Sequence, residues 1–103
     1  MKDSIVINMK YAEYDMIDGT PNVERHHIFG GANRALSDED GLWVPLTKEH
    51  HTAGKLSVHT CGVVKDLMHI IGQLAWEKHC IAGGESEESA RELFRKRYGR
   101  SYL

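Results

Sequence analysis

Residues 23–51 read VERHHIFGGANRALSDEDGLWVPLTKEHH, and the strongest secondary-structure signals of the chain lie in this segment. It holds two short runs rich in β-branched and aromatic residues, 23–29 and 42–46, separated by a polar segment that contains glycines. Runs of this kind, bounded by turn residues, are typical of strands, and Pro45 favours a strand end or a sheet edge. Thr47 suits the N-cap of a short helix. The stretch therefore predicts a β-hairpin around a long loop, followed directly by a short helix.

The rest of the chain predicts one further strand and two helices. Residues 4–9 (SIVINM) form a short β-branched run that indicates an N-terminal strand. Apolar residues recur at spacings of three and four over residues 63–80, the pattern of an amphipathic helix, and we expect the apolar stripe of residues 64–75 in the core. A terminal helix is predicted over residues 86–98, with Ser86 as its N-cap and Gly99 at its end. The predicted fold class is therefore α+β.

Composition indicates one domain over residues 1–103. The chain is 41% hydrophobic and 27% charged, with a net charge of -2, and it is too short for two separate cores. No apolar run approaches the roughly 18 residues of a membrane span, and the N-terminus lacks the pattern of a secretory signal. These features favour a cytoplasmic protein without a membrane partner. Cys61 and Cys80 are expected to be reduced and buried, because thiols of a cytosolic protein stay reduced. The chain has no C-x-x-C pair, which excludes a cysteine-based zinc knuckle.

The charge is unevenly spread along the chain. Residues 91–103 hold five basic side chains against one glutamate. A basic face of this kind can meet phosphate although the whole chain is slightly acidic, and a solvated helix face is an equally good interpretation.

Histidines are the residues that indicate chemistry. Five of the seven lie between residues 26 and 59, as the pairs His26-His27 and His50-His51 and the single His59. Imidazole is the commonest protein ligand for zinc and related metals, and it transfers protons near neutral pH. Neighbouring residues on a strand point to opposite faces, so the two strand histidines are expected to have different tasks. One strand histidine, one of the helix pair and the loop histidine would share a metal, while the other strand histidine would deprotonate water. That combination predicts phosphodiester hydrolysis.

Other residues have plainer interpretations. An isolated histidine is more often a surface or packing residue, and we expect this of His69 and His79 on the long helix. Trp43 and Trp76 are expected in the core rather than as platforms on which bases stack.

Several of these segments together resemble a known family. The segments are HHIFGGANR (residues 26–34), LSDEDGLWVPL (36–46), KEHH (48–51), SVH (57–59) and YGRSYL (98–103). They resemble small phage and prophage proteins of the HNH, or His-Me finger, endonuclease superfamily, and are similar to its recombination-associated phage nucleases. The resemblance implies a ββα-metal finger over about residues 23–59, built from a hairpin and a helix that clasp one divalent metal ion.

The resemblance also implies a role for individual residues. His26 and His51 would bind the metal ion, with His59 as a further ligand. His27 would be the general base, and Asn33 would be the asparagine that orients this base through the loop backbone. The ion itself would be zinc, magnesium, manganese or nickel.

The chain departs from the family pattern at three places. Relatives often have the asparagine just before the second strand, where this chain has Asp40. They also have a second helical ligand one turn after the first, where this chain has Lys55, and His59 is the natural replacement. Many relatives brace the finger with cysteine-bound zinc, but the corresponding residues here are Asp15, Asp18 and Thr47. A structural zinc is therefore not expected.

The leading hypothesis is a metal-dependent endonuclease or nickase that hydrolyses DNA phosphodiester bonds, phage-encoded and active in recombination or DNA processing in the host cytoplasm. Arg25, Arg34 and Lys55 are candidate contacts to DNA phosphates. The alternative is a catalytically silent metal- or DNA-binding module that keeps the HNH skeleton. A third hypothesis is a partner-binding protein that uses the long helix. A homodimer and a complex with a recombination protein are further candidate assemblies.

Overall fold

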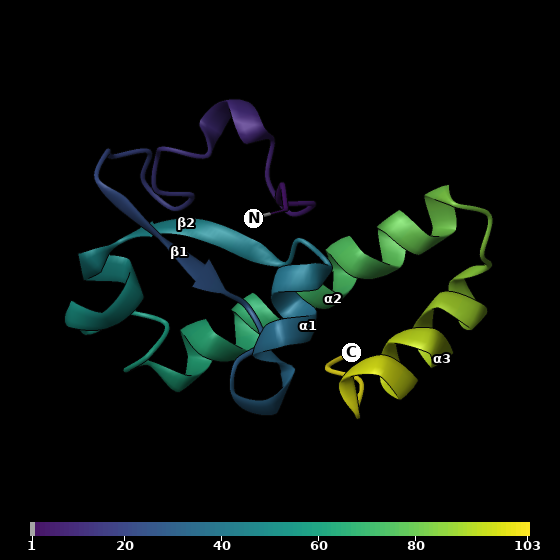
Figure 1. Cartoon of the computed structure of the whole chain (residues 1–103). Helices are drawn as coiled ribbons and strands as arrows, with labels where there is room; N and C mark the ends of the chain where they lie inside the picture. The colour runs from purple at the N-terminus through teal and green to yellow at the C-terminus, as the bar shows by residue number, and fades with distance from the viewer. Residues whose placement is uncertain (1) are drawn as a thin grey trace.

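A two-stranded antiparallel sheet forms the middle of the molecule in this computed structural model, which describes residues 2–103 (Figure 1). Strand β1 (Val23–His27) pairs with strand β2 (Trp43–Thr47), so that Val23 lies opposite Thr47 and His27 opposite Trp43. Helices surround this hairpin, and the fold class is α+β as predicted. The first four residues of β2 are all buried, because the N-terminal segment lies over this strand and α2 passes on the other side (Figure 1).

The segment between the strands is more regular than the predicted loop. It contains the 3-10 turn η2 (Gly31–Asn33) and the short helix α1 (Arg34–Glu39). Ser37 is fully buried in α1; its hydroxyl donates to the carbonyl of Leu42 (2.7 Å) and accepts from the amide of Phe29 (3.2 Å). One buried serine thus ties both ends of the connection together and holds α1 against the hairpin.

The predicted N-terminal strand over residues 4–9 is wrong. The hydroxyl of Ser4 accepts hydrogen bonds from the amides two and three residues later (3.0 and 3.4 Å) and donates to the carbonyl of Trp43 (2.7 Å). A side chain that binds nearby amides competes with the ladder of a sheet, so the segment turns instead of extending. It continues into the 3-10 turn η1 (Met9–Tyr11), and its isoleucines still pack against the core.

The short helix predicted after β2 is a single π-helical turn, η3 (Glu49–Ala53). Thr47 does not cap it; Lys48 holds the N-cap position, and the Thr47 hydroxyl donates to Asp15 instead (3.0 Å). Short π-helical turns occur frequently at functional sites.

Both predicted C-terminal helices are present. Helix α2 (Gly62–Ala82) begins one residue earlier and ends two residues later than predicted. Helix α3 (Glu87–Tyr98) has Ser86 as its N-cap, and Gly99 follows it with a left-handed φ of 88°.

The apolar stripe of α2 is only partly in the core. Met68 is buried and Val64 and Ala75 pack against the core, but Leu67 and Leu74 are 54% and 51% exposed. The expectation that the whole stripe is buried is therefore wrong. Trp43 is fully buried and Trp76 packs against the core, as expected.

Asp40, at the C-terminal end of α1, connects this helix to α2 and α3. Its carboxylate accepts hydrogen bonds from Trp76 (3.0 Å), from the guanidinium of Arg97 (2.7 and 2.8 Å) and from the hydroxyl of Tyr98 (2.7 Å). Arg91 pairs with a glutamate of α2 at 2.8 Å. Much of the basic tail is thus used within the chain.

The last residues fold back onto α2 (Figure 1). The side-chain amide of Gln73 is fully buried; its oxygen accepts from the amide of Tyr102 (2.6 Å) and its nitrogen donates to the Ser101 hydroxyl (3.0 Å). This contact places the Tyr102 ring beside Phe29, with ring centroids 5.4 Å apart.

Cys61 and Cys80 are both free and partly exposed, so the thiols are unpaired as expected but are not buried. Within residues 2–103, no helix combines the length and the apolar character needed to cross a bilayer.

Candidate metal centre

The structure brings His26, His51 and His59 together. One ring nitrogen from each lies within 4.8 Å of those of the other two, close enough to hold a single ion. The ring centroids are 5.1 Å apart for His26 and His51, 5.4 Å for His26 and His59, and 4.8 Å for His51 and His59. We call these three residues the histidine triad.

Each member of the triad comes from a different segment. His26 lies on β1 with its ring on the inner face, and His51 lies on η3. His59 follows in the next loop, and its position depends on backbone contacts: its amide donates to the carbonyl of His51 (3.3 Å), and the amide of Val58 donates to that of His50 (2.9 Å). These contacts return the loop to η3, so that His59 takes a place beside His51.

The electrostatics of the site favour neutral imidazoles at His26 and His59. Burial is the main cause that lowers the pKa of His26 to about 3, and the nearby imidazoles of His51 and His59 lower it further. Burial also lowers the pKa of His59, with added contributions from His51 and Lys65. A histidine must be unprotonated to bind a metal ion, so His26 and His59 are prepared for this at neutral pH.

A carboxylate orients His51. Its Nδ1–H donates to the Glu24 carboxylate at 2.9 Å, because an ionised carboxylate can only accept. This hydrogen bond leaves Nε2 as the free ligand atom. Partners of this kind hold the ring of a metal-binding histidine and raise its basicity.

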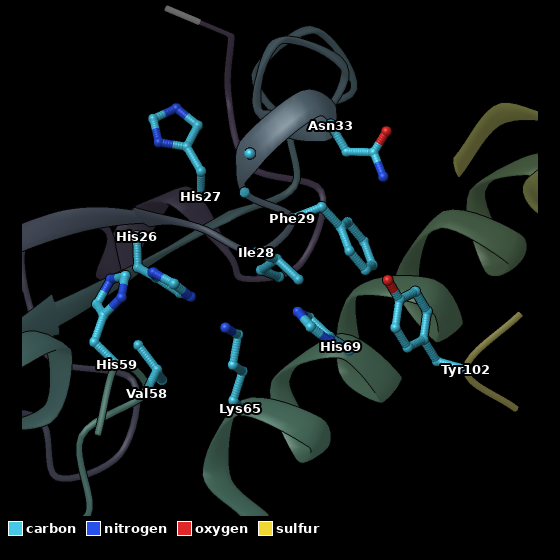
Figure 2. Close-up of a pocket in the computed structure, with 12 residues that line it drawn as sticks. His26, His27, Ile28, Phe29, Asn33, Val58, His59, Lys65, His69 and Tyr102 are labelled. Atoms are coloured by element: carbon cyan, nitrogen blue, oxygen red, sulfur yellow. The ribbon is translucent and has the colours of Figure 1, made fainter. Parts of the chain in front are cut away.

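His27 is on the opposite face of β1 from His26, as the strand geometry predicts (Figure 2). Its Nε2–H donates to the Asp38 carboxylate of α1 at 3.2 Å. The side chain is 14% exposed. With Nε2 bound to Asp38, Nδ1 is the nitrogen that can accept a proton.

His50 takes no part in the triad. Its Nδ1–H donates to Asp15 at 2.8 Å, and this hydrogen bond raises the pKa of His50. The alternative in which His50 replaces His51 as a ligand is therefore not the arrangement in this structure.

Asp15, Asp18 and His50 form a second group whose ligand atoms lie within 4.8 Å of one another. Asp15 is buried, and its carboxylate already accepts five hydrogen bonds, which come from three backbone amides, the Thr47 hydroxyl and His50. This carboxylate is satisfied by protein donors alone. The group joins the segment before β1 to the end of β2 and to η3.

Asn33 has a different contact from the one its predicted role requires. Its side-chain amide donates to the carbonyl of Tyr98 at 3.1 Å, at the end of α3. Figure 2 shows the side chain directed away from His27. The group that orients the His27 ring is Asp38.

Two adjoining cavities flank the triad. One, of about 320 Å³, is lined by His26, His51 and His59 together with Arg25 and Arg34. The guanidinium of Arg25 also lies over the Trp43 ring, 4.1 Å from its centroid. Two of the three predicted DNA contacts therefore border the site.

The other cavity, of about 390 Å³, runs from the triad along α2. Lys65 and His69 line it, whereas Lys55, the third predicted contact, is an exposed residue that lines neither cavity. Lys65 is thus a cation of the site that the sequence analysis missed.

Glu24 and Asp38 were also missed. Glu24 stands two residues before the first histidine of β1, so strand alternation places it on the same face as His26 and could have indicated it. Asp38 had no such signal, because it depends on how α1 packs against β1.

Comparisons with protein-family models, with curated proteins and with solved structures find no match to the chain.

Proposed function

We propose that the protein is a metal-dependent DNA endonuclease or nickase, in which β1, β2 and η3 act as a ββα-metal finger. The observation that carries the proposal is the histidine triad together with a histidine–carboxylate pair, His27 and Asp38. His27 is on the opposite face of β1 from His26, but it lines both cavities that flank the triad. A phage origin, a role in recombination or DNA processing and a place in the host cytoplasm belong to the same proposal.

The triad fits one divalent ion. Its three imidazole donors suit zinc, nickel and related metals, and three protein ligands leave a position open for substrate. His26 and His59 are held neutral, and Glu24 leaves Nε2 of His51 free. A bound ion would stabilise negative charge on the phosphate and on the leaving oxygen.

His27 would take the proton from the attacking water at Nδ1. Asp38 would keep the ring in this tautomer and stabilise the imidazolium that forms, in the way that carboxylates support catalytic histidines elsewhere. Arg25 and Arg34 would bind phosphates on the side of the triad that they border.

A catalytically silent DNA- or metal-binding module is the second candidate. The contact of Asn33 favours it, because this amide is bound to Tyr98 instead of the loop that carries His27. Tight zinc binding without turnover would be its signature.

Partner binding through α2 also has an observation in its favour. Val63, Leu67 and Leu74 are 68%, 54% and 51% exposed on this helix. A homodimer or a complex with a recombination protein would use these side chains. Sedimentation velocity of the wild type and of Leu74→Glu tests the homodimer. If the homodimer forms through α2, the wild type should sediment as a dimer and Leu74→Glu as a monomer.

Plasmid nicking with purified protein tests the proposed reaction. The panel contains zinc, magnesium, manganese and nickel, and the variants are His27→Ala, Asp38→Asn and, as a matched control, His79→Ala on the exposed end of α2. We expect the wild type and the control to nick DNA with at least one metal. Loss of the base in His27→Ala should slow cleavage by about 10²- to 10⁴-fold, with a smaller loss in Asp38→Asn.

Circular dichroism of each variant separates loss of the base from loss of the fold. Absence of cleavage by folded wild-type protein with every metal would reject the enzyme and leave the silent module.

A further inference from the structure

The cavity beside the triad extends further than a metal ion and one phosphate require. His26 and His59 line one end of its 390 Å³, and His69 and Tyr102 line the other. Figure 2 shows these two ends on either side of Lys65, whose side chain rises from α2 toward the space between them.

The end away from the triad is aromatic. The rings of Phe29 and His69 are stacked with centroids 5.2 Å apart and an interplanar angle of 20°. The rings of His69 and Tyr102 are 4.7 Å apart at 51°. Aromatic side chains of this kind are what nucleobases stack on, with little regard to base identity.

Lys65 supplies positive charge between the two ends. Burial is the main cause that lowers the pKa of His59 on one side and of His69 on the other, and the charge of Lys65 lowers both further. Within residues 2–103, no carboxylate forms a salt bridge with Lys65. The ammonium group is therefore available to an anion that enters the cavity.

We propose that this cavity is a subsite for one unpaired nucleotide next to the phosphate that is cleaved. Lys65 binds the phosphate of that nucleotide, and its base lies against His69 and Tyr102. The inference rests on the proposed function and narrows its substrate to DNA that is single-stranded or has an unpaired nucleotide at the cleavage position. In a continuous duplex the bases are stacked inside the helix and must leave it before they can enter a cavity.

Binding to a bulged duplex tests the subsite apart from cleavage. The probe carries one unpaired 2-aminopurine, and a fully paired duplex of the same sequence is the reference. Affinity is measured by fluorescence anisotropy, and stacking by quenching of 2-aminopurine, with the full chain and without divalent metal. We expect the bulged duplex to bind about tenfold more tightly than the paired one, with quenching.

Matched variants identify the side chains responsible. Lys65→Gln and Tyr102→Leu should each remove most of this preference, whereas Lys78→Gln and Tyr11→Leu, which change exposed residues outside the cavity, should keep it. Equal affinity for the two duplexes, or an unchanged preference in folded Lys65→Gln protein, would overturn the subsite.

Cleavage assays distinguish failure of the nucleotide subsite from failure of the proposed nuclease activity. Nicking of bulged and paired duplexes at equal rates would reject the subsite and keep the nuclease. A bulge preference that depends on Lys65, without cleavage under any metal, would keep the subsite and reject the nuclease.

Discussion

Carboxylates decide which nitrogen the key histidines present. Glu24 accepts from Nδ1 of His51 at 2.9 Å, which leaves Nε2 for an ion, and Asp38 accepts from Nε2 of His27 at 3.2 Å, which leaves Nδ1 for a proton. Two residues of the same type therefore present different atoms. The difference comes from the neighbouring carboxylate and not from the imidazole itself.

Glu24→Gln should weaken zinc binding by about 10- to 100-fold, because an amide orients His51 without adding negative charge. Isothermal titration calorimetry with zinc measures the affinity. Glu13→Gln, an exposed glutamate outside the site, is the control and should bind as the wild type does. Equal affinities in all three proteins would mean that Glu24 does not support the ligand.

Asp15 should make stability depend on acid pH. Burial alone would raise the pKa of this carboxyl, but hydrogen bonds from Thr47, His50, Ile17 and Asp18 outweigh it and lower the pKa to about 2. Since the folded pKa lies below the unfolded one, the contribution is complete above about pH 4 and is lost as the pH falls through 2. Its size is about 2 kcal/mol.

Urea unfolding of the wild type and Asp15→Asn between pH 2 and 5 measures this contribution. His50 stays protonated over this range, so the difference in unfolding free energy reports mainly on the carboxylate. The advantage of the wild type should shrink toward pH 2. An advantage that is constant with pH would contradict the prediction.

At the scale of elements, the site depends on how closely α2 approaches the end of β1. A Cβ atom at Gly72 would lie 2.6 Å from a methyl carbon of Ile28 and 3.1 Å from the Phe29 ring. Glycine has a low helix propensity, so Gly72 is unfavourable for α2 on sequence grounds. In the structure it permits the close contact with Ile28 and Phe29, which line the cavity of about 390 Å³.

Gly72→Ala should therefore destabilise the protein by about 1–3 kcal/mol, although alanine favours the helix by roughly 1 kcal/mol. Gly62→Ala in the first turn of the same helix is the matched control, because nothing lies within 4 Å of a Cβ there. Chemical denaturation of both variants measures the effect. A gain in stability for Gly72→Ala would show that α2 can move away from Ile28 at little cost.

At the scale of the whole molecule, the triad joins three segments that are separate in sequence: β1, η3 and the loop before α2. An ion bound there would link the hairpin to the following segment in the folded state alone. Zinc at about 100 times its dissociation constant should raise the melting temperature by roughly 10 °C.

Differential scanning fluorimetry of the wild type, His51→Gln and His79→Gln measures this shift. The shift should disappear in His51→Gln and persist in His79→Gln, whose histidine is exposed at the end of α2. The same shift in His51→Gln would place the ion elsewhere, and the group around Asp15 would be the next candidate.

Much of the fold could be predicted from local patterns. The hairpin and both C-terminal helices were predicted because residue type, spacing and caps act over a few neighbouring residues. The N-terminal strand failed because Ser4 binds the amides that a strand would use. The expected burial of the apolar face of α2 was only partly correct. The spacing of apolar residues shows which face of a helix is apolar, but it does not show how much of that face other segments cover.

Sequence information was enough to indicate the residue types that could take part in chemistry, which are five histidines on a short hairpin, the following turn and the next loop. Tertiary structure alone decided their partners. Asp38 lies 11 residues from His27, Glu24 lies 27 from His51, and the carbonyl that holds Asn33 lies 65 residues away. Contacts over such separations depend on how the elements pack, and strand alternation shows only that Glu24 shares a face with His26. The same packing brought Lys65 and Tyr102 to the cavity beside the triad.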